Sequence, residues 1–171
     1  MMRKISKHAI PAKTARGFTL VELLVSVLVF AIGLLGLTYL QMSGLRTNQM
    51  SLMRTQATAE AYNMADRLRA NPVAAGAGNY NGAPAASTQD CIGDDKSCTP
   101  AQMAAFDRNA WLASLGQLPS GSGTVISDGG APATSFSIIV RWDQNRTGAS
   151  ETDCPPEDPD DLRCYRLDIT L

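Results

Sequence analysis

Residues Phe18 to Leu40 read FTLVELLVSVLVFAIGLLGLTYL, a run of 23 residues in which Glu22 is the single charged side chain. At a rise of about 1.5 Å per residue, a helix of this length crosses the roughly 30 Å hydrocarbon core of a membrane. Segment 18–40 therefore predicts a hydrophobic transmembrane helix. It divides the chain into a short segment before it, 1–17, and a long one after it, 41–171.

The 17 residues before this segment form a basic leader. They hold five of the 15 Lys and Arg residues and none of the 16 acidic ones, so the remainder has ten basic and 16 acidic side chains, a net charge of −6. The next basic residue is Arg46, and this asymmetry predicts a cytoplasmic N-terminus with the acidic body outside the inner membrane. An acidic body also argues against a nucleic-acid partner, and none is expected. The leader's basic residues are Arg3, Lys4, Lys7, Lys13 and Arg16.

Two ordinary interpretations of the apolar segment leave something unexplained. A cleaved secretory signal peptide has an apolar stretch of about 7–15 residues followed by a small-x-small cleavage site. Here the run is longer, and its best triplet, Ala31-Ile32-Gly33, lies in its middle. An uncleaved signal anchor accounts for length and orientation but not for Glu22, because an ionised carboxylate in a bilayer costs about 2.5–3.5 kcal/mol.

The third interpretation uses the residues at the start of the segment. The motif GFTLVE, from Gly17 to Glu22, resembles the prepilin signature of type IV pilins and type II secretion pseudopilins. The resemblance implies cleavage by prepilin peptidase between Gly17 and Phe18, N-methylation of Phe18, and a mature chain whose fifth residue is Glu22. In a filament of packed helices, Glu22 is then expected to neutralise the Phe18 amine of a neighbouring subunit during assembly. Pairing within the same chain, one helical turn apart, is the alternative.

Beyond Leu40 the apolar residues become confined to one side of the expected helix. They recur mostly at steps of three and four residues with charged side chains between them, which is the pattern of an amphipathic helix. Segment 41–70 thus continues the membrane helix, and Asn71-Pro72 ends it, because the residue before a proline disfavours helical geometry. One helix is expected from Phe18 to Ala70, with an apolar face made of Leu45, Met53, Ala57, Ala61, Met64 and Leu68.

Residues 71–171, here called the head, have the pattern of a small globular domain. Residues 73–89 are rich in Ala, Gly, Asn and Pro and predict an irregular connecting loop. Thr99, Pro100 and Gln102 have the spacing of a capped helix start, which predicts a short helix over 100–115. The side chains expected to be buried on this helix are Met103, Phe106, Trp111, Leu112 and Leu115.

Three later segments of the head predict β-strands: 124–127, 135–142 and 162–171. The last segment alternates apolar with polar residues, with Arg163 and Tyr165 assigned to the polar face and Leu167, Ile169 and Leu171 to the apolar face. It therefore predicts a half-buried terminal strand. We expect an α+β, type IV pilin-like fold, in which the long N-terminal helix packs on a small antiparallel sheet of three or four strands.

The head contains all four cysteines of the chain. Outside the inner membrane they are expected to form disulfides. Of the three possible pairings, Cys91–Cys98 with Cys154–Cys164 is the simplest, because each bond closes a small loop. Zinc is the rival interpretation, but neither spacing is usual for zinc ligands, and the one histidine, His8, belongs to the leader. The loop between Cys154 and Cys164 also resembles the stapled C-terminal region common in pilins.

Acidic residues and prolines crowd around this second cysteine loop. Carboxylates on a constrained loop have the chemistry of calcium ligands. However, the spacing matches no EF-hand pattern, and acidic, proline-rich loops are usually solvated, so no metal is expected. The weak calcium candidates are Asp153, Asp158, Asp160 and Asp161.

No catalytic motif stands out in the sequence. Without His8 a Ser-His-Asp or Cys-His arrangement cannot form in the mature chain. The phosphate-binding loop, the dinucleotide fingerprint and the HExxH zinc motif are also absent. The chain is therefore expected to be a structural component and the substrate of a processing enzyme, not itself an enzyme, and to need no cofactor.

The resemblance to pilins extends beyond the leader. Stretches such as Gly33–Leu37 and Ala65–Asn71 look closest to minor pilins, which are low-abundance subunits that prime pilus assembly. The implied partners are prepilin peptidase, other minor and major pilins and the inner-membrane assembly platform. The implied location is the inner membrane before assembly and the pilus or its tip afterwards, in support of adhesion or motility. Two alternatives stay open: a minor pseudopilin of type II secretion, and an anchored periplasmic binding module that never polymerises.

Overall fold

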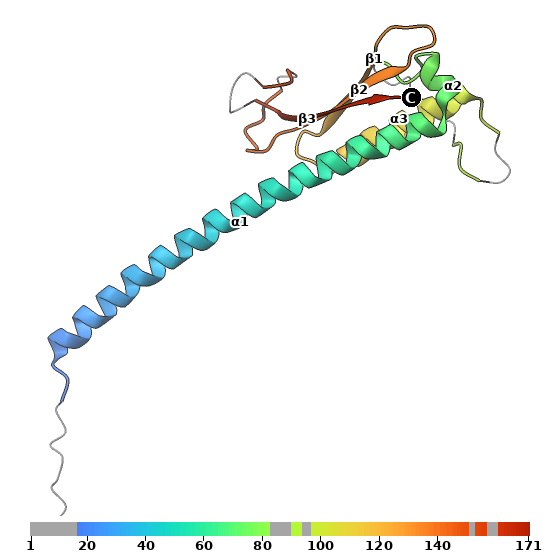
Figure 1. Cartoon of the computed structure of the whole chain (residues 1–171). Helices are drawn as coiled ribbons and strands as arrows, with labels where there is room; N and C mark the ends of the chain where they lie inside the picture. The colour runs from blue at the N-terminus through green and yellow to red at the C-terminus, as the bar shows by residue number, and fades with distance from the viewer. Residues whose placement is uncertain (1–16, 83–89, 94–96, 151–152, 157–160) are drawn as a thin grey trace, which may run out of the picture. The chain divides into compact units, whose positions relative to one another are not determined.

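The computed structural model describes residues 17–82, 90–93, 97–150, 153–156 and 161–171. Helices and strands follow one another in the order of a long helix, two short helices and a three-stranded sheet (Figure 1). This α+β architecture is the one that the sequence predicts. The elements are α1 (Leu20–Ala70), α2 (Pro72–Gly76), α3 (Pro100–Leu115), β1 (Ser122–Ser127), β2 (Ser135–Trp142) and β3 (Arg163–Thr170).

Contacts divide the chain into two compact units, Met1–Leu45 and Arg46–Leu171. The helix α1 has 51 residues and runs through both. In the first unit, every described side chain is exposed. Among the described residues, α1 is the one helix long and apolar enough to cross a membrane. It begins two residues later than the sequence predicts.

The packed face of α1 lies in the second unit. Ala57, Ala61, Met64 and Leu68 are fully buried there, as the amphipathic pattern predicts. Leu45, at the other end of the predicted apolar face, is 63% exposed. The amphipathic pattern therefore continues further towards the N-terminus than the burial does. Met53 is partly buried and packs against the core.

The helix α1 ends at Ala70, and a second helix follows at once. The prediction of an irregular loop over 73–89 is wrong for its first residues, since α2 spans Pro72–Gly76. Proline is well placed at the first position of a helix, where its missing N–H is not needed. Ala74 and Ala75 are buried, so packing stabilises this short helix. The amino-acid composition of the segment does not indicate that packing.

The three strands form one antiparallel sheet in the order β1-β2-β3. In the register, Val125 pairs with Ile138, and Ile138 pairs with Leu167. The bounds of β2 are those predicted, β1 begins two residues earlier than predicted, and β3 is shorter by one residue at each end. Within the described residues the sheet therefore has three strands, the lower of the two predicted numbers.

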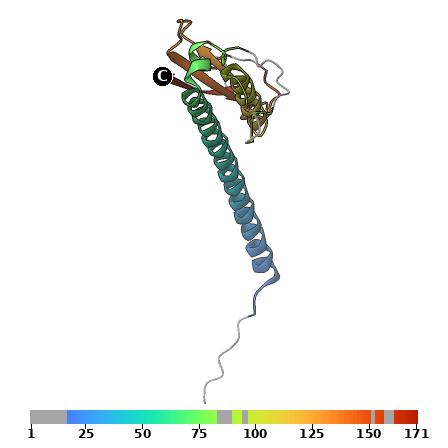
Figure 2. The ribbon, with the colours of Figure 1, turned by 90° about the vertical axis from the view of Figure 1, so that its right-hand side faces the viewer.

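One face of the sheet packs on the buried side of α1 to form the core. Alternate residues of β2 share this face and are almost entirely buried, and Ile139 and Arg141 on the opposite face are buried as well. The residues on the core face pack with the buried residues of α1 into one hydrophobic cluster. Figures 1 and 2 both place the sheet and α3 beside the C-terminal part of α1. The core residues of β2 are Phe136, Ile138, Val140 and Trp142.

The faces of β3 differ from the prediction at one residue. Tyr165 was expected on the polar face, but it packs against the core together with Leu167. Alternation explains this, because residues two apart on a strand share a face and Ile169 of the same parity is buried. Leu171, after the end of the strand, is 39% exposed in spite of its predicted apolar face.

The helix α3 begins with the predicted capping box. The Thr99 hydroxyl accepts from the Gln102 backbone N–H, and the Gln102 side chain accepts from the Thr99 N–H at 2.8 Å. Trp111 and Leu115 are buried as predicted. The indole N–H of Trp111 donates to the Glu60 carbonyl at 2.9 Å, which ties α3 to α1.

The remaining predictions for α3 are only partly right. Met103, Phe106 and Leu112 are half-buried, whereas the charged Asp107 and Arg108 are buried. The physical reason is that polar partners meet α3 on its inner side. Sequence periodicity alone assigns such residues to solvent.

A buried polar network joins α3 to α1. The Asp107 carboxylate accepts from Arg67 at 2.7 Å and from the Tyr80 hydroxyl at 2.7 Å. Burial and the hydrogen bond to Asp107 raise the pKa of Tyr80 far above its ordinary value, so its hydroxyl stays a donor at neutral pH. Pairing of this kind offsets the cost of burying the carboxylate.

Both predicted disulfides are present in the head. Cys91 bonds to Cys98, and Cys154 bonds to Cys164, with Cα–Cα distances of 5.8 and 5.9 Å. The described part of the chain holds no free cysteine. The second bond ties the segment that follows β2 to the terminal strand β3.

Candidate functional site

The segment at the start of α1 contains the predicted processing and assembly residues. Gly17, Phe18 and Thr19 precede the helix and are exposed. The Thr19 hydroxyl accepts from the backbone N–H of Glu22 at 3.3 Å, and the Thr19 carbonyl accepts from the N–H of Leu23 at 3.2 Å. Thr19 is therefore the N-cap of α1. The helix begins at the next residue, Leu20, three residues after Gly17.

Sequence reasoning missed the role of Thr19, although a signal for it is present. Thr19 and Glu22 have the S/T-x-x-E spacing of a capping box. In the structure one half of the box is formed, by the Thr19 hydroxyl. This cap defines where the regular helix begins and leaves the two residues before it in non-helical backbone.

Gly17 is not required by the fold of this chain. A Cβ atom built at Gly17 meets no heavy atom within 4 Å, and its φ lies outside the left-handed region. The neighbouring Phe18 is 80% exposed. A glycine that neither packing nor backbone geometry requires is consistent with a requirement set by another molecule, such as an enzyme that binds this bond.

Glu22 occupies the first turn of α1 on an otherwise apolar surface. A negative charge near a helix N-terminus interacts favourably with the helix dipole. Within the described residues, the Glu22 carboxylate makes no ion pair or hydrogen bond, while its backbone carbonyl accepts from Ser26 at 2.7 Å. A chain cut before Phe18 would place a positive amine at the positive end of this helix. Among residues 18–45, Glu22 is the one acidic side chain with which such an amine could pair.

Comparison with known protein families supports this interpretation of the segment. Residues 12–38 match the family model described as the prokaryotic N-terminal methylation motif, and residues 39–109 match the model of type IV pilin Tt1218. The two matches adjoin one another, and over residues 12–109 the chain is type IV pilin-like. No curated protein and no solved structure gives a significant match to this pilin-like chain.

Type IV pilins are structural proteins, and the methylation motif followed by an apolar helix fits a membrane-anchored pilin. The apolar helix α1 is long and apolar enough to serve as such an anchor. The methylation motif covers Gly17, Phe18 and Glu22. The second match extends through most of α3, so it covers the buried face of α1 and the Arg67–Asp107 pair of this pilin.

The calcium candidates are not brought together in the described part of the pilin. Asp153 is exposed and Asp161 is partly buried, whereas Asp158 and Asp160 lie outside the described residues, as does the leader up to Arg16. Over the described ranges, no group of three or more His, Cys, Asp or Glu side chains is arranged to hold a metal ion. The four cysteines are all disulfide-bonded and have no free thiolate for a metal.

Proposed function

We propose that this chain is a minor type IV pilin of the PilV kind. Prepilin peptidase would cut it between Gly17 and Phe18 and methylate the new Phe18 amine. The processed subunit then takes part in initiating pilus assembly with other minor and major pilins. Its function is structural, and it supports adhesion or twitching motility through the filament rather than through catalysis.

The observation that carries this proposal is the start of α1. An exposed glycine that the fold does not need directly precedes a capped helix whose first turn bears one unpaired carboxylate, in the part of the chain that the structure describes. Each feature has a purpose in a processed and assembled subunit: access for a peptidase, a defined new N-terminus, and a partner for its amine. An uncleaved anchor would use none of them.

The proposed location follows from the charge pattern around the apolar part of α1. Five basic residues precede it and Arg46 is the first one after it, which favours a cytoplasmic N-terminus in the inner membrane. The head would then face the periplasm, where oxidising conditions favour the two disulfides. After assembly the subunit would reside in the pilus, with the tip as the expected position.

The test is the intact mass and N-terminal peptide of the protein from cells with and without prepilin peptidase. We expect a peptidase-dependent form that begins with methylated Phe18 and lacks residues 1–17. A chain that begins with Met1 in both strains would overturn the proposal and leave an anchored binding module. Deletion of the gene then distinguishes a type IV pilin from a type II secretion pseudopilin. Loss of pili in the deletion strain supports a pilin, whereas loss of protein secretion with normal pili supports a pseudopilin.

A further inference from the structure

The strand β1 is an edge strand whose outer side is only partly occupied. The sheet order β1-β2-β3 leaves one side of β1 without a neighbouring strand. At one end this side is closed by Asn81, whose side-chain oxygen accepts from the Ser127 backbone N–H at 3.0 Å. The Asn81 amide also donates to the Ser127 hydroxyl at 2.7 Å. A residue outside the sheet, Asn81, therefore already forms hydrogen bonds with this edge of β1.

The pairing pattern identifies which other backbone groups point outward. The Asp128 N–H donates to the Ser135 carbonyl of the β2 side, whereas the preceding Ser127 N–H points away towards Asn81. Because inward and outward groups alternate along an antiparallel strand, the N–H and C=O groups of Gly123 and Val125 also point outward. No described residue bonds to these outward groups.

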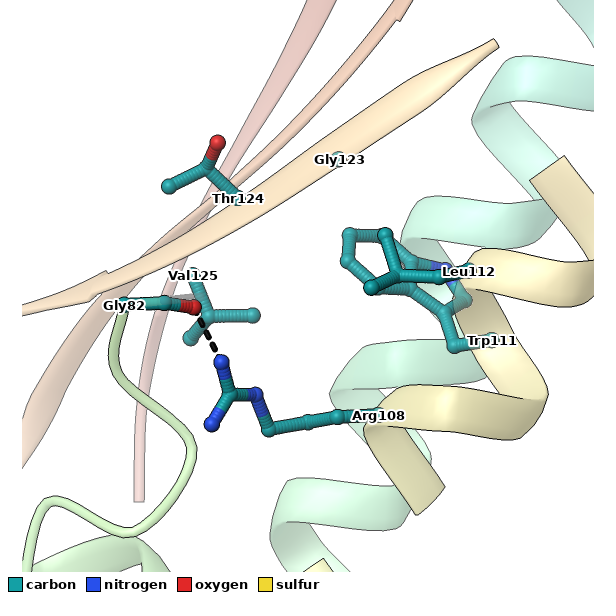
Figure 3. A pocket seen from close by; sticks show the side chains of 7 residues that line it. All are labelled: Gly82, Arg108, Trp111, Leu112, Gly123, Thr124 and Val125. Atoms are coloured by element: carbon teal, nitrogen blue, oxygen red, sulfur yellow. Dashed lines mark hydrogen bonds between the residues drawn. The ribbon is translucent and has the colours of Figure 1, made fainter. Parts of the chain in front are cut away.

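A cavity of about 320 Å³ lies along this part of the edge. Figure 3 shows it between β1 and α3, with the Arg108 side chain reaching from α3 towards Gly82 and Val125. Trp111 and Leu112 form an apolar wall on the same helix. The cavity thus combines an apolar surface, a cationic group and the outward backbone groups of an edge strand.

Arg108 carries a positive charge that no described carboxylate neutralises. It is 93% buried, being 7% exposed, and its guanidinium donates to two backbone carbonyls, of Asn79 at 3.4 Å and of Gly82. The adjacent Asp107 is engaged by Arg67 and Tyr80 instead. A buried cation without an anion is costly, so this site favours a negatively charged group from another molecule.

The other edge of the sheet differs in composition. The sequence of β3, RCYRLDIT, carries three charged side chains, which discourage pairing with another strand. The sequence of β1, SGTVIS, carries none and has no proline. Among the described residues, the edge of β1 next to Arg108 is therefore the one that is open to a further strand.

We propose that the outer edge of β1, at Gly123–Val125, binds a short extended segment of a partner pilin head, with a carboxylate of that segment seated against Arg108. Main-chain bonds to β1 would hold the segment, and the apolar wall of Trp111 and Leu112 would contact one of its side chains. The inference rests on the proposed function, because it takes the partner to be another subunit of the same assembly.

The test uses the full chain in cells that assemble it into filaments. Ile126, which is 51% exposed on β1, is replaced by the photo-crosslinking residue p-benzoylphenylalanine, and Asp168 on β3 is replaced in a matched control. We expect a crosslink from position 126 to an acidic, extended segment of another pilin, mapped by mass spectrometry. Arg108→Gln should reduce its yield roughly tenfold or more, whereas Arg166→Gln should change it by less than about twofold.

A second measurement does not depend on any substitution. Hydrogen exchange of the Gly123 and Val125 amides should be fast in the detergent-solubilised chain and strongly slowed in filaments. Unchanged exchange together with no crosslink from position 126, in filaments that contain the protein, would overturn the inference alone. Absence of a processed chain from sheared filaments would overturn the proposed function and the inference with it.

Discussion

Asp107 is the residue whose replacement should most damage the packing between α3 and α1. Its buried carboxylate receives hydrogen bonds from Arg67 and Tyr80. Asp107→Ala removes the acceptor that these two donors share. Arg67 keeps its bond to Asn63 at 2.8 Å, and Tyr80 keeps only a longer one, at 3.4 Å, to the Arg67 carbonyl, so we expect a loss of about 2–3 kcal/mol in the free energy of unfolding. Urea denaturation followed by the fluorescence of Trp111 and Trp142, both buried in the head, measures it.

The control for this prediction is an ion pair on the surface. Asp66 and Arg69 are linked at 2.9 Å, but their side chains are 76% and 50% exposed. Asp66→Ala should change the free energy of unfolding by no more than about 0.5 kcal/mol. Equal losses in the two variants would contradict the assignment of the Asp107 network as the stabilising one.

Asp143 should make the stability of the head depend on pH in the acidic range. Burial alone would raise its pKa, but hydrogen bonds from the backbone N–H groups of Gly148 and Thr147, among others, outweigh burial and lower the pKa. The N–H of Gly148 donates at 2.8 Å and that of Thr147 at 3.2 Å. The ionised carboxylate therefore holds the turn that follows β2.

Because the pKa of Asp143 is lower in the folded than in the unfolded protein, its ionised carboxylate stabilises the fold. This stabilisation is complete at pH values above the unfolded pKa of about 3.9, and it is lost as the pH falls from there towards the folded pKa. Asp143→Asn should therefore lower stability at pH 7 and make the remaining decline between pH 5 and 3 shallower. Denaturation midpoints at several pH values report this. Parallel curves for the two proteins would show that Asp143 does not titrate with folding.

At the level of elements, the capping box sets the start of α3. Thr99→Ala removes the hydroxyl that accepts from the Gln102 N–H, and we expect a loss of about 1 kcal/mol in the stability of the head. The matched control is Thr55→Ala on α1, where the hydroxyl bonds to the carbonyl of Ser51 in its own helix. That change should be close to neutral. Helical signal and the denaturation midpoint measure both variants, and a neutral Thr99→Ala would contradict the cap.

Local signals were sufficient to predict some elements and not others. The helix α3 and the strand β2 have the predicted bounds because a capping box and a β-branched run mark them directly. The short α2 was missed, since its stability comes from the burial of Ala74 and Ala75 by residues distant in sequence. The burial of Asp107 was missed for the same reason, because its partners lie 40 and 27 residues away.

The candidate processing site is visible as a local sequence pattern, and its role stays a prediction. Gly17, Phe18 and Glu22 lie in one contiguous motif, so their spacing is visible without tertiary structure. The Thr19 cap follows a local pattern too, the S/T-x-x-E spacing of Thr19 and Glu22. The edge of β1 could not be predicted, because it depends on strand order and on the position of Arg108 in space.

At the scale of the whole molecule, assembly and folding should respond to different residues. Glu22 lies in the first unit and the described core lies in the second. Glu22→Gln should therefore leave the fluorescence-detected stability of the head unchanged while reducing incorporation into filaments by roughly tenfold or more. Quantitative mass spectrometry of sheared filaments measures incorporation.

Ser26→Ala provides the control one turn along the same helix. Its hydroxyl bonds only to the carbonyl of Glu22 within α1, among the described residues, so its loss should leave incorporation unchanged. If Glu22→Gln assembled as well as the wild type, the Phe18 amine would have to be neutralised by another group. If both variants failed equally, helix structure rather than charge would be responsible.

From Phe18 to Leu45 the described side chains are exposed to their surroundings, and most of them are hydrocarbon. This part of α1 therefore needs a solvent other than water at every stage. Lipid tails and the apolar helices of neighbouring subunits are nearly equivalent surroundings for such a surface. In the proposed assembly, a subunit that leaves the bilayer for a filament would exchange one apolar environment for another. In this assembly, the bilayer would therefore store the subunit in surroundings that cost little to leave for the filament.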